Sequence, residues 1–508
     1  MNKFLNNMPV FMVFLTMIAF SWCYGGSQAN ELFGIIPWLF IFLFEALIFF
    51  PQRYANETIV DARERVMYKL KRDPVLYFSI LFLVILIIPF VNKGLCPVCD
   101  YPQIMAGAEQ KPPMPYLPFC IDREEHFGLI LWFLPIFTGL LAVRHSLTPS
   151  GKRLFLEFMV WNSTLLALLG FVQAGTGAEF PYWAKEENPV YFFSTFGYPN
   201  MGGSFFLMMF CFSIGLWQHR VIETENDPLT DIQKSQYEKF MVRTIRAHYP
   251  VVAVVFNFFA TMFTLCRAAI FMLMVVSVFA FAYCILRLLY SRTNRAKKVR
   301  SAGFLTGGVL LFLIAVFVFA PKTITDEIGS VTSLEALDRI SGKGQYHTRV
   351  AGEIFKDYPF FGVGGWGYRH FCLQYMTDEE KAEIQEIGGI NVHNDYMQFL
   401  CEHGAVGTLL LISILLGLLI PICSAWYMLY RAARFTKGKD APPKPLVVFS
   451  LPAGTFWILI GTTCVTIHSF ADCPLRSGAV LSSYLISLAC ASGFLVGVKK
   501  KKTHGGHR

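Results

Sequence analysis

The chain alternates between long apolar runs and shorter polar connections over most of its 508 residues. A membrane-spanning helix needs about 17 to 25 mainly apolar residues. Twelve runs meet this requirement, at residues 8–24, 32–51, 75–91, 128–143, 154–174, 199–217, 250–265, 268–290, 302–320, 405–429, 446–466 and 477–498. The pattern therefore predicts an all-α polytopic membrane protein with about twelve transmembrane helices. A signal peptide cleaved near residues 27–29 is the alternative for the first run and leaves eleven helices in the same orientation.

The basic residues indicate how these helices are oriented. Lys and Arg collect in the short cytoplasmic loops of membrane proteins. Of the 44 Lys and Arg residues, 31 lie on the side of the termini and 13 on the other side. Both termini are therefore predicted to be cytoplasmic. The net charge of +9 follows from this topology, so we expect no nucleic-acid partner, and the basic tail at 499–502 is read as an anchor to membrane lipids.

The rest of the composition agrees with this class. Hydrophobic residues make up 54% of the chain and charged residues 16%, which excludes disordered and collagen-like proteins. The longest polar stretch, 321–404, faces outward between the ninth and tenth helices and is expected to fold into a helical cap. We divide the chain into residues 1–249 with helices 1–6, residues 250–425 with the cap, and residues 426–508 with helices 11–12 and the tail.

Several outer cysteines are candidates for disulfides or metal ligands. Cys96 and Cys99 form a CxxC pair, with Cys120 and His126 downstream. This set fits a structural disulfide, which we favour, a redox pair, or a zinc site with three Cys and one His. Cys372 and Cys401 form a second candidate pair in the large loop, and the spacing alone leaves the pairing of all five cysteines unassigned.

Two other patterns have competing interpretations. Residues 362–367 match GxGxxG, but they lie outside the membrane and follow no strand, so a dinucleotide site is excluded and a tight turn or a close ligand approach remains. Glu45 and Glu157 fall within predicted helices. A carboxylate there is either a proton-relay group of a transporter or a buried, hydrogen-bonded acid.

The candidate catalytic and phosphate-binding residues lie in segments that are predicted to face outward. Arg267 lies in a very short outer turn, and Arg349 and His393 lie in the large loop. An Arg fork binds phosphate oxygens well, and imidazole exchanges a proton near neutral pH. Each residue alone also has an ordinary structural explanation, such as a lipid headgroup contact or a buried hydrogen bond.

Several separate motifs resemble those of the O-antigen ligase family, which shares its core with Wzy-type polymerases and bacterial O-oligosaccharyltransferases. The ligase signature is matched by His393, Asn394, Gly404 and Gly407 in the correct spacing. Residues 357–364 and the preceding Arg349 resemble the family's Arg and "D-P-L-L-G-V-G" segment. Residues 266–269 resemble its Ser-Arg-Gly-Ala turn, from which Cys266 and Ala268 depart. Further similar segments are 197–200 and 468–475, and residues 250–425 carry the best resemblance.

The resemblance implies a GT-C-type, inverting glycosyltransferase of lipopolysaccharide or surface polysaccharide biosynthesis in the bacterial inner membrane. Such an enzyme moves a glycan from undecaprenyl diphosphate to a hydroxyl of lipid A core or another glycan or protein, at a periplasmic site and without a metal or other cofactor. His393 would act as the base, and Arg349 and Arg267 would stabilise the diphosphate. The expected substrate-binding residues are Asn394, Gly362, Gly364, Asn200 and Asp472.

Other functions remain open at this point. A Wzy-type polymerase or a protein O-oligosaccharyltransferase would use the same donor with a different acceptor. A transporter or flippase would use many helices, but it should show internal repeats and has no need of His393. A purely structural membrane protein does not account for the clustered outer motifs.

Overall fold

The computed structural model describes residues 3–26, 34–92, 114, 116–185, 191–225, 236–290, 334–381, 391–435 and 450–495. Within these ranges the elements are helices, with one isolated bridge between Phe193 and Phe196. The first half contains α1 (Lys3–Trp22), α3 (Ile36–Ile48), α4 (Ile59–Leu70), α5 (Pro74–Ile87), α6 (Arg123–Leu141), α7 (Pro149–Gly175) and α8 (Pro199–Glu225). The remaining α-helices are α9 (Gln236–His248), α10 (Val251–Phe263), α11 (Arg267–Tyr290), α14 (Leu334–Asp357), α15 (Tyr368–Phe371), α17 (Asp395–Phe435), α18 (Ala453–His468) and α19 (Gly478–Ala491).

The apolar helices agree with the predicted spans as far as they are described. Seven helices are long and apolar enough to cross a membrane, and the pair α4–α5, bent by 68°, makes an eighth if it counts as one span. Three shorter apolar helices, Ile36–Ile48, Ala453–His468 and Gly478–Phe494, coincide with three further predicted runs. The predicted span at 302–320 lies outside the described residues, so the count of twelve stays a prediction.

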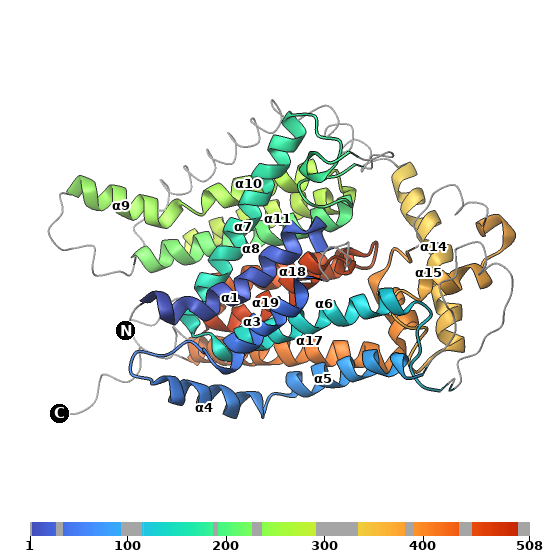
Figure 1. The fold of residues 1–508 in the computed structure, drawn as a ribbon. Helices are drawn as coiled ribbons and strands as arrows, with labels where there is room; N and C mark the ends of the chain where they lie inside the picture. Colours follow the sequence, from blue (N-terminus) through green and yellow to red (C-terminus); the bar gives the residue numbers. More distant parts are fainter. Residues whose placement is uncertain are drawn as a thin grey trace.

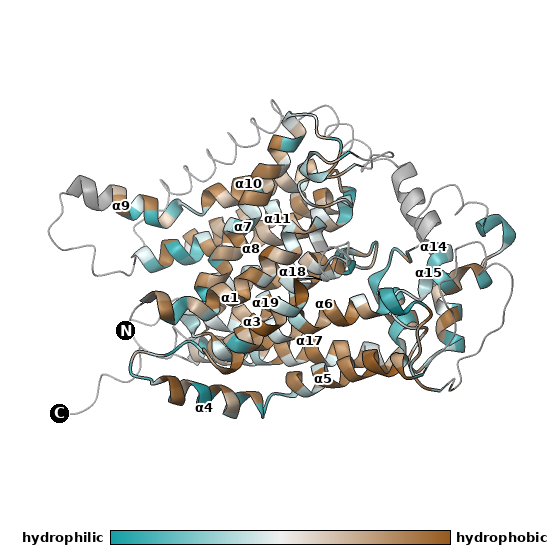
Figure 2. Ribbon diagram, viewed as in Figure 1, coloured by the Kyte–Doolittle hydropathy of each residue, from teal (hydrophilic) through white to brown (hydrophobic). Residues whose placement is uncertain are grey.

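The helices run side by side in one bundle whose two ends differ (Figure 1). α14 and α15 lie at one end, and α4 and α9 lie at the other. Hydrophilic residues gather at these two ends, while the middle of the bundle is mainly hydrophobic (Figure 2). This arrangement matches the predicted division into two faces, and which of them is cytoplasmic remains an expectation.

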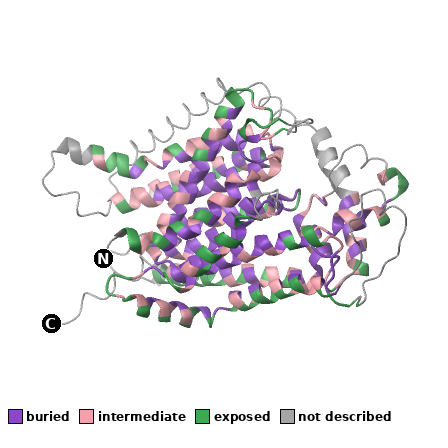
Figure 3. Cartoon of the chain, in the orientation of Figure 1, coloured by how far each residue is buried: buried purple, intermediate pink, exposed green. Residues whose placement is uncertain are grey.

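Buried residues occupy the interior of the bundle (Figure 3), and the hydrophobic ones are aromatic and aliphatic. Helices α8, α18 and α19 lie at its centre and are buried along most of their length. Helices α11 and α17 instead carry exposed apolar side chains such as Phe271, Val278, Leu409 and Ile420. Exposed apolar helix faces of this extent are expected where lipid, not water, is the solvent.

The described part of the large outer loop has a small core of its own. Val350, Ala351 and Ile354 of α14 pack with Val363, Tyr368, Phe371 and Cys401, among others. The cap expected between the ninth and tenth helices is therefore folded in the ranges 334–381 and 391–404. It is built on one long helix, α14, and several short ones.

A break in α17 joins this cap to the bundle. Gly404 has φ +63°, which opens the helical hydrogen bonding at this point. The freed amides of Ala405 and Val406 donate to the carbonyls of Pro359 and Phe360, at 2.8 and 3.0 Å. In return, the carbonyls of Cys401 and Glu402 accept from the amides of Val363 and Gly364, at 3.0 and 2.9 Å. The segment 359–364 is therefore bonded into the break from both sides, which satisfies backbone groups that would otherwise be orphaned.

Candidate active site

The loop between α18 and α19 is held against the start of α17. The Asp395 amide donates to the Ser469 carbonyl at 2.9 Å, and the Asp395 carboxylate accepts from the Leu475 amide at 2.9 Å. A third contact joins Glu402 of α17 to Arg476, 2.5 Å apart and both almost fully buried. These contacts place the intervening residue, Asp472, beside the residues that precede α17.

Asp472 is surrounded by hydrogen-bond donors. Its carboxylate accepts from Tyr198 Oη at 3.2 Å, from Asn200 Nδ2 and from the Cys473 amide at 2.7 Å. Tyr198 and Asn200 lie at the start of α8, far from Asp472 in the sequence. Burial by itself raises the pKa of Asp472, but the contacts with His393 and the Cys473 amide outweigh it and lower this pKa below its usual value. The carboxylate is therefore ionised and fixed in orientation.

His393 faces this carboxylate from the residues just before α17. Its Nδ1 lies 3.4 Å from Asp472 Oδ1, and 39% of its side chain is exposed. The contact with Asp472 raises the pKa of His393 against the opposing effect of burial. The backbone of His393 has φ +53°, a conformation that a residue with a side chain rarely adopts outside a constrained site. No partner within the described ranges hydrogen-bonds to its Nε2.

A second imidazole lies behind His393. The ring of His347, on α14, is 6.1 Å from the ring of His393, centre to centre. His347 is buried, and its Nδ1 lies 2.8 Å from Tyr368 Oη. Burial, and secondarily the nearby His393, lowers the pKa of His347 to about 4, so this ring is neutral near neutral pH.

The short turn before α11 lies at the same end of the bundle. Cys266 Sγ is 3.8 Å from His468 Nε2, and His468 Nδ1 is 2.5 Å from Ser204 Oγ of α8. The predicted phosphate ligand Arg267 follows Cys266 directly, begins α11 and is half-buried. Arg267 is thus linked to the Asp472 loop through Cys266, its neighbour in the sequence, and through His468, the last residue of α18.

Arg349 has a different environment. Its guanidinium donates to both oxygens of Glu353, at 2.9 and 3.0 Å, and to both oxygens of Glu380, at 2.9 and 2.7 Å. Its side chain is 41% exposed. The structure therefore places Arg349 on the cap surface, two residues from His347, with its charge matched by two carboxylates.

The remaining predicted binding residues have partners within the protein. Asn394 precedes α17, and its side-chain oxygen accepts from the Met397 amide at 3.1 Å, as an N-cap does. Gly362 and Gly364 have φ +66° and +85°. A Cβ on Gly362 would lie 2.4 Å from the Cys401 carbonyl oxygen, and one on Gly364 would lie 2.5 Å from the Phe119 carbonyl oxygen. Both glycines serve the close approach of 359–364 to its neighbours.

Several contacts at this site were not foreseen from the sequence. Tyr198 belongs to a segment noted for its resemblance, but its bond to Asp472 was not predicted. The buried pair of Glu402 and Arg476 was not predicted either, and the Arg476 guanidinium also lies 4.7 Å from the centre of the Trp366 ring. Charged residues directly beside apolar helices are a sequence signal for such pairs, because a buried charge needs a partner.

The outer cysteines, His126 and Glu157 were also candidate functional residues in the sequence. Cys120, Cys372 and Cys401 are free, while Cys96 and Cys99 lie outside the described residues. His126 is buried, with Nε2 2.8 Å from the Leu86 carbonyl and Nδ1 accepting from Gly365, which leaves no nitrogen for zinc. Glu157 is partly buried and is paired with Arg220 at 2.5 Å and with Tyr249, as a hydrogen-bonded acid would be.

Among the described residues, two groups of side chains have the composition of a metal site. His393, Asp472 and Cys473 form one, and Asp122, Glu125 and His370 form the other, each with its candidate ligand atoms within 4.8 Å of one another. The second group lies at the start of α6, where Asp122 already caps the helix and Arg369 pairs with Glu125.

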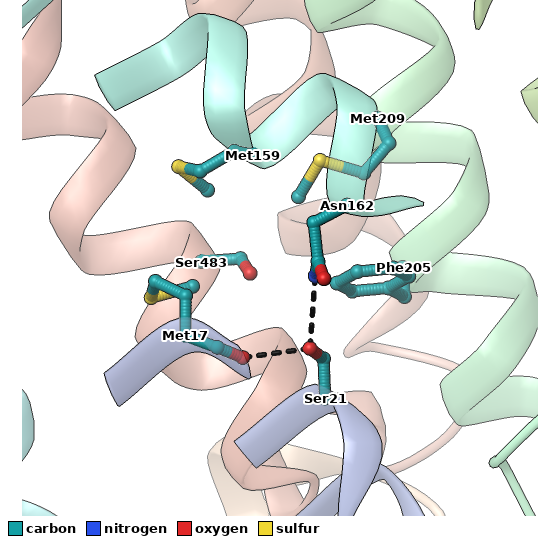
Figure 4. Close-up of a pocket in the computed structure, with 7 residues that line it drawn as sticks. All are labelled: Met17, Ser21, Met159, Asn162, Phe205, Met209 and Ser483. Carbon is teal, nitrogen blue, oxygen red and sulfur yellow. Dashed lines mark hydrogen bonds between the residues drawn. The ribbon is translucent and has the colours of Figure 1, made fainter. Parts of the chain in front are cut away.

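A small internal pocket lies elsewhere in the bundle, where α1, α7, α8 and α19 meet (Figure 4). Asn162 donates to Ser21, and Ser21 donates to the Met17 carbonyl (Figure 4). Met159, Phe205, Met209 and Ser483 complete its lining. The pocket contains none of the predicted site residues, and we assign its polar groups to helix packing.

Comparison with known proteins supports the resemblance noted in the sequence. Residues 252–412 match the family described as O-antigen ligase (Wzy_C). No curated protein matches the chain. The matched range contains Arg267, Arg349, His393 and Asn394, whereas Asn200 and Asp472 lie outside it. The match at residues 252–412 therefore supports the assignment of this membrane protein to the O-antigen ligase family.

Proposed function

We propose that the protein is an inverting, metal-independent glycosyltransferase of the GT-C type. It transfers a glycan from undecaprenyl diphosphate to an acceptor hydroxyl at the periplasmic face of the bacterial inner membrane, as an O-antigen ligase does. The observation that carries the proposal is the contact between His393 and the buried Asp472. The family match at residues 252–412 supports the reaction class.

His393 acts as the base in this proposal. Asp472 accepts from Nδ1–H and so holds the proton on that nitrogen, which leaves the lone pair of Nε2 for the acceptor hydroxyl. Tyr198 and Asn200 fix Asp472 in turn. The hydroxyl gives its proton to Nε2 as its oxygen attacks the anomeric carbon from the face opposite the diphosphate. One displacement of this kind inverts the anomeric configuration.

The arginines stabilise the leaving group. Breaking the anomeric bond leaves negative charge on the diphosphate, and fixed guanidinium groups offset such charge. Arg267 begins α11 and follows Cys266, whose Sγ lies 3.8 Å from His468 Nε2. Arg349 must exchange Glu353 and Glu380 for phosphate oxygens, so its contribution depends on a movement of its side chain.

The other predicted binding residues fall into two groups. Asn200 and Asp472 lie together beside His393, where an acceptor hydroxyl would approach. The Asn394 side chain is hydrogen-bonded within the protein, and Gly362 and Gly364 allow close contact with neighbouring backbone. We propose that these three shape the site around His393 instead of holding the substrate directly.

The test is reconstitution of the full chain in lipid with undecaprenyl-diphosphate glycan and a panel of acceptors. Mass spectrometry then identifies which molecule gains sugar. Glycan on lipid A core would identify a ligase, lengthening on the lipid carrier a polymerase, and glycan on protein an oligosaccharyltransferase. Transfer must disappear in His393→Ala. Equal transfer by this variant, or no transfer to any acceptor by the wild type, would overturn the proposal.

A further inference from the structure

Three potential metal ligands meet at the proposed base. The His393 imidazole, the Asp472 carboxylate and the Cys473 thiol offer one ligand atom each, all within 4.8 Å of one another. They combine a nitrogen, an oxygen and a sulfur ligand, which is the mixture that zinc accepts. The Cys473 thiol donates a hydrogen bond to Asp472 Oδ1, but it takes no step of its own in the proposed transfer reaction.

Two of the three distances between these atoms are close to the edges of a tetrahedral zinc site. With Zn–N and Zn–O bonds of about 2.0 Å and a Zn–S bond of about 2.3 Å, tetrahedral ligand atoms lie about 3.3 to 3.6 Å apart. Asp472 Oδ1 lies 3.4 Å from His393 Nδ1 and 3.3 Å from Cys473 Sγ. The first distance is also longer than the roughly 2.7 to 2.9 Å of a charge-assisted hydrogen bond.

The surroundings support the same three ligands. Tyr198 and Asn200 bond to the Asp472 carboxylate and orient it, as second-layer groups commonly do for metal ligands. Cys473 is 1% exposed and approaches from the protein interior. The His393 side chain is 39% exposed, so an ion can enter from its side and keep a fourth position for water.

We propose that His393, Asp472 and Cys473 form an inhibitory site for Zn²⁺ or a similar thiol-binding divalent cation. On binding, the Cys473 thiol releases its proton to solvent and the thiolate coordinates the ion. The ion also coordinates His393 Nδ1, so the imidazole proton is confined to Nε2. Nε2 then cannot accept a proton from the acceptor hydroxyl, and transfer stops. The ion is an inhibitor here, not a cofactor.

Binding of the ion does not depend on the proposed transfer reaction, whereas the inhibition rests on the proposed function. The experiments therefore measure binding first. Full-length protein in detergent is stripped with EDTA and titrated with Zn²⁺ against a chromogenic chelator. We expect one ion per chain at this site, and Cys473→Ser to weaken binding by about tenfold or more. The matched control, Cys423→Ser, changes an exposed cysteine of α17 and should bind as the wild type does.

Co²⁺ identifies the ligand directly. The wild type should show thiolate-to-metal charge-transfer absorption with Co²⁺, and Cys473→Ala should lose it while keeping the far-UV spectrum of the folded protein. Absence of the band in the wild type, or its persistence in Cys473→Ala, would overturn the site. These measurements need no transfer activity, so they remain decisive even if the proposed reaction is wrong.

Inhibition is then measured in the transfer assay. Zn²⁺ should abolish wild-type transfer, EDTA should restore it, and Cys473→Ser should need about tenfold more Zn²⁺ or more. Because Cys473 also bonds to Asp472, the inhibition of each protein is measured against its own transfer rate without Zn²⁺. Equal sensitivity of the two proteins would contradict the proposal. Relief by Glu125→Gln instead would do the same, because it would assign the inhibition to Asp122, Glu125 and His370.

Discussion

The surroundings of Asp472 and those of Arg349 differ although both belong to the predicted site. Asp472 is buried and receives donors from the start of α8 and from its own loop, while His393 faces it from the residues just before α17. Arg349 is 41% exposed and is held by two carboxylates of the cap. The proposed base and the acid proposed to orient it are therefore in place before substrate binds. The arginine must first change partners, so substitutions at the two places should differ in size and in kind.

Loss of the base should have the largest effect. Positioned general bases contribute about 10²- to 10⁴-fold to rate, so His393→Ala should reduce transfer by that factor or abolish it. His393 has φ +53°, and Asn tolerates this conformation better than Ala. His393→Asn is therefore the second variant. Transfer near the wild-type rate by a well-folded His393→Asn protein would contradict the assignment.

Loss of the orienting carboxylate should have the next largest effect. A hydrogen bond to a charged group contributes roughly 1.5 to 3 kcal/mol, which corresponds to about 10- to 100-fold in rate. Asp472→Asn should reduce kcat by this factor near neutral pH, because the imidazole loses its fixed orientation. Asn keeps the size of the side chain, so thermal unfolding should change little. Steady-state kinetics that show a change in KM alone would refute the orienting role.

Substitution of Arg349 should have a smaller effect with a different signature. Arg349→Ala should raise the KM for the lipid-linked donor and lower kcat/KM by about tenfold or more. Arg349→Lys should recover only part of this loss, since an ammonium cannot form the two-pronged contact with phosphate. The control is Glu353→Gln, which removes only an exposed pair of small energetic value. Arg349→Lys with wild-type kinetics would remove Arg349 from the phosphate site.

The smallest effect on the chemistry is expected at the break in α17. A Cβ on Gly404 would lie 2.3 Å from the Phe360 carbonyl carbon and oxygen, and the residue has φ +63°. Gly404→Ala should therefore destabilise the protein by about 1 to 3 kcal/mol. The measurement is thermal unfolding, which should occur at a lower temperature. Activity per folded molecule should be nearly unchanged. The control is Gly352→Ala in α14, where the nearest outside atom would be 3.8 Å away. Equal stability of the two variants would contradict the structural role of the break.

Much of the fold could be predicted because apolar runs are a direct consequence of the membrane. The long helices α7, α8 and α11 begin and end within a few residues of the predicted runs or extend beyond them. The start of α17 was not predicted, because residues 395–404 mix apolar side chains with Asp395, Gln398, Glu402 and His403 and lie ahead of the apolar run. The break at Gly404 depends on bonds with 359–364, and no local pattern encodes such contacts.

The site was predictable in its residue types but not in its contacts. His393, Asn200 and Asp472 were each named from motifs, yet their juxtaposition comes from tertiary contacts. One is the bond between the Asp395 amide and Ser469, and another is the buried pair of Glu402 and Arg476. Two residues expected to act alike, Arg267 and Arg349, lie in unlike surroundings. Motif spacing describes one segment of the chain, so it cannot show which carboxylate will neutralise a distant arginine.

The pH dependence of transfer tests most directly whether Asp472 controls the base. His393 must be neutral to accept a proton, so kcat/KM should rise with pH through the pKa of His393. Asp472 raises that pKa, and the wild-type rise should therefore lie above the usual value of about 6.5. In Asp472→Asn only the effect of burial remains, so the rise should move to lower pH. An unchanged profile, or a shift to higher pH, would contradict the proposed pairing of His393 and Asp472.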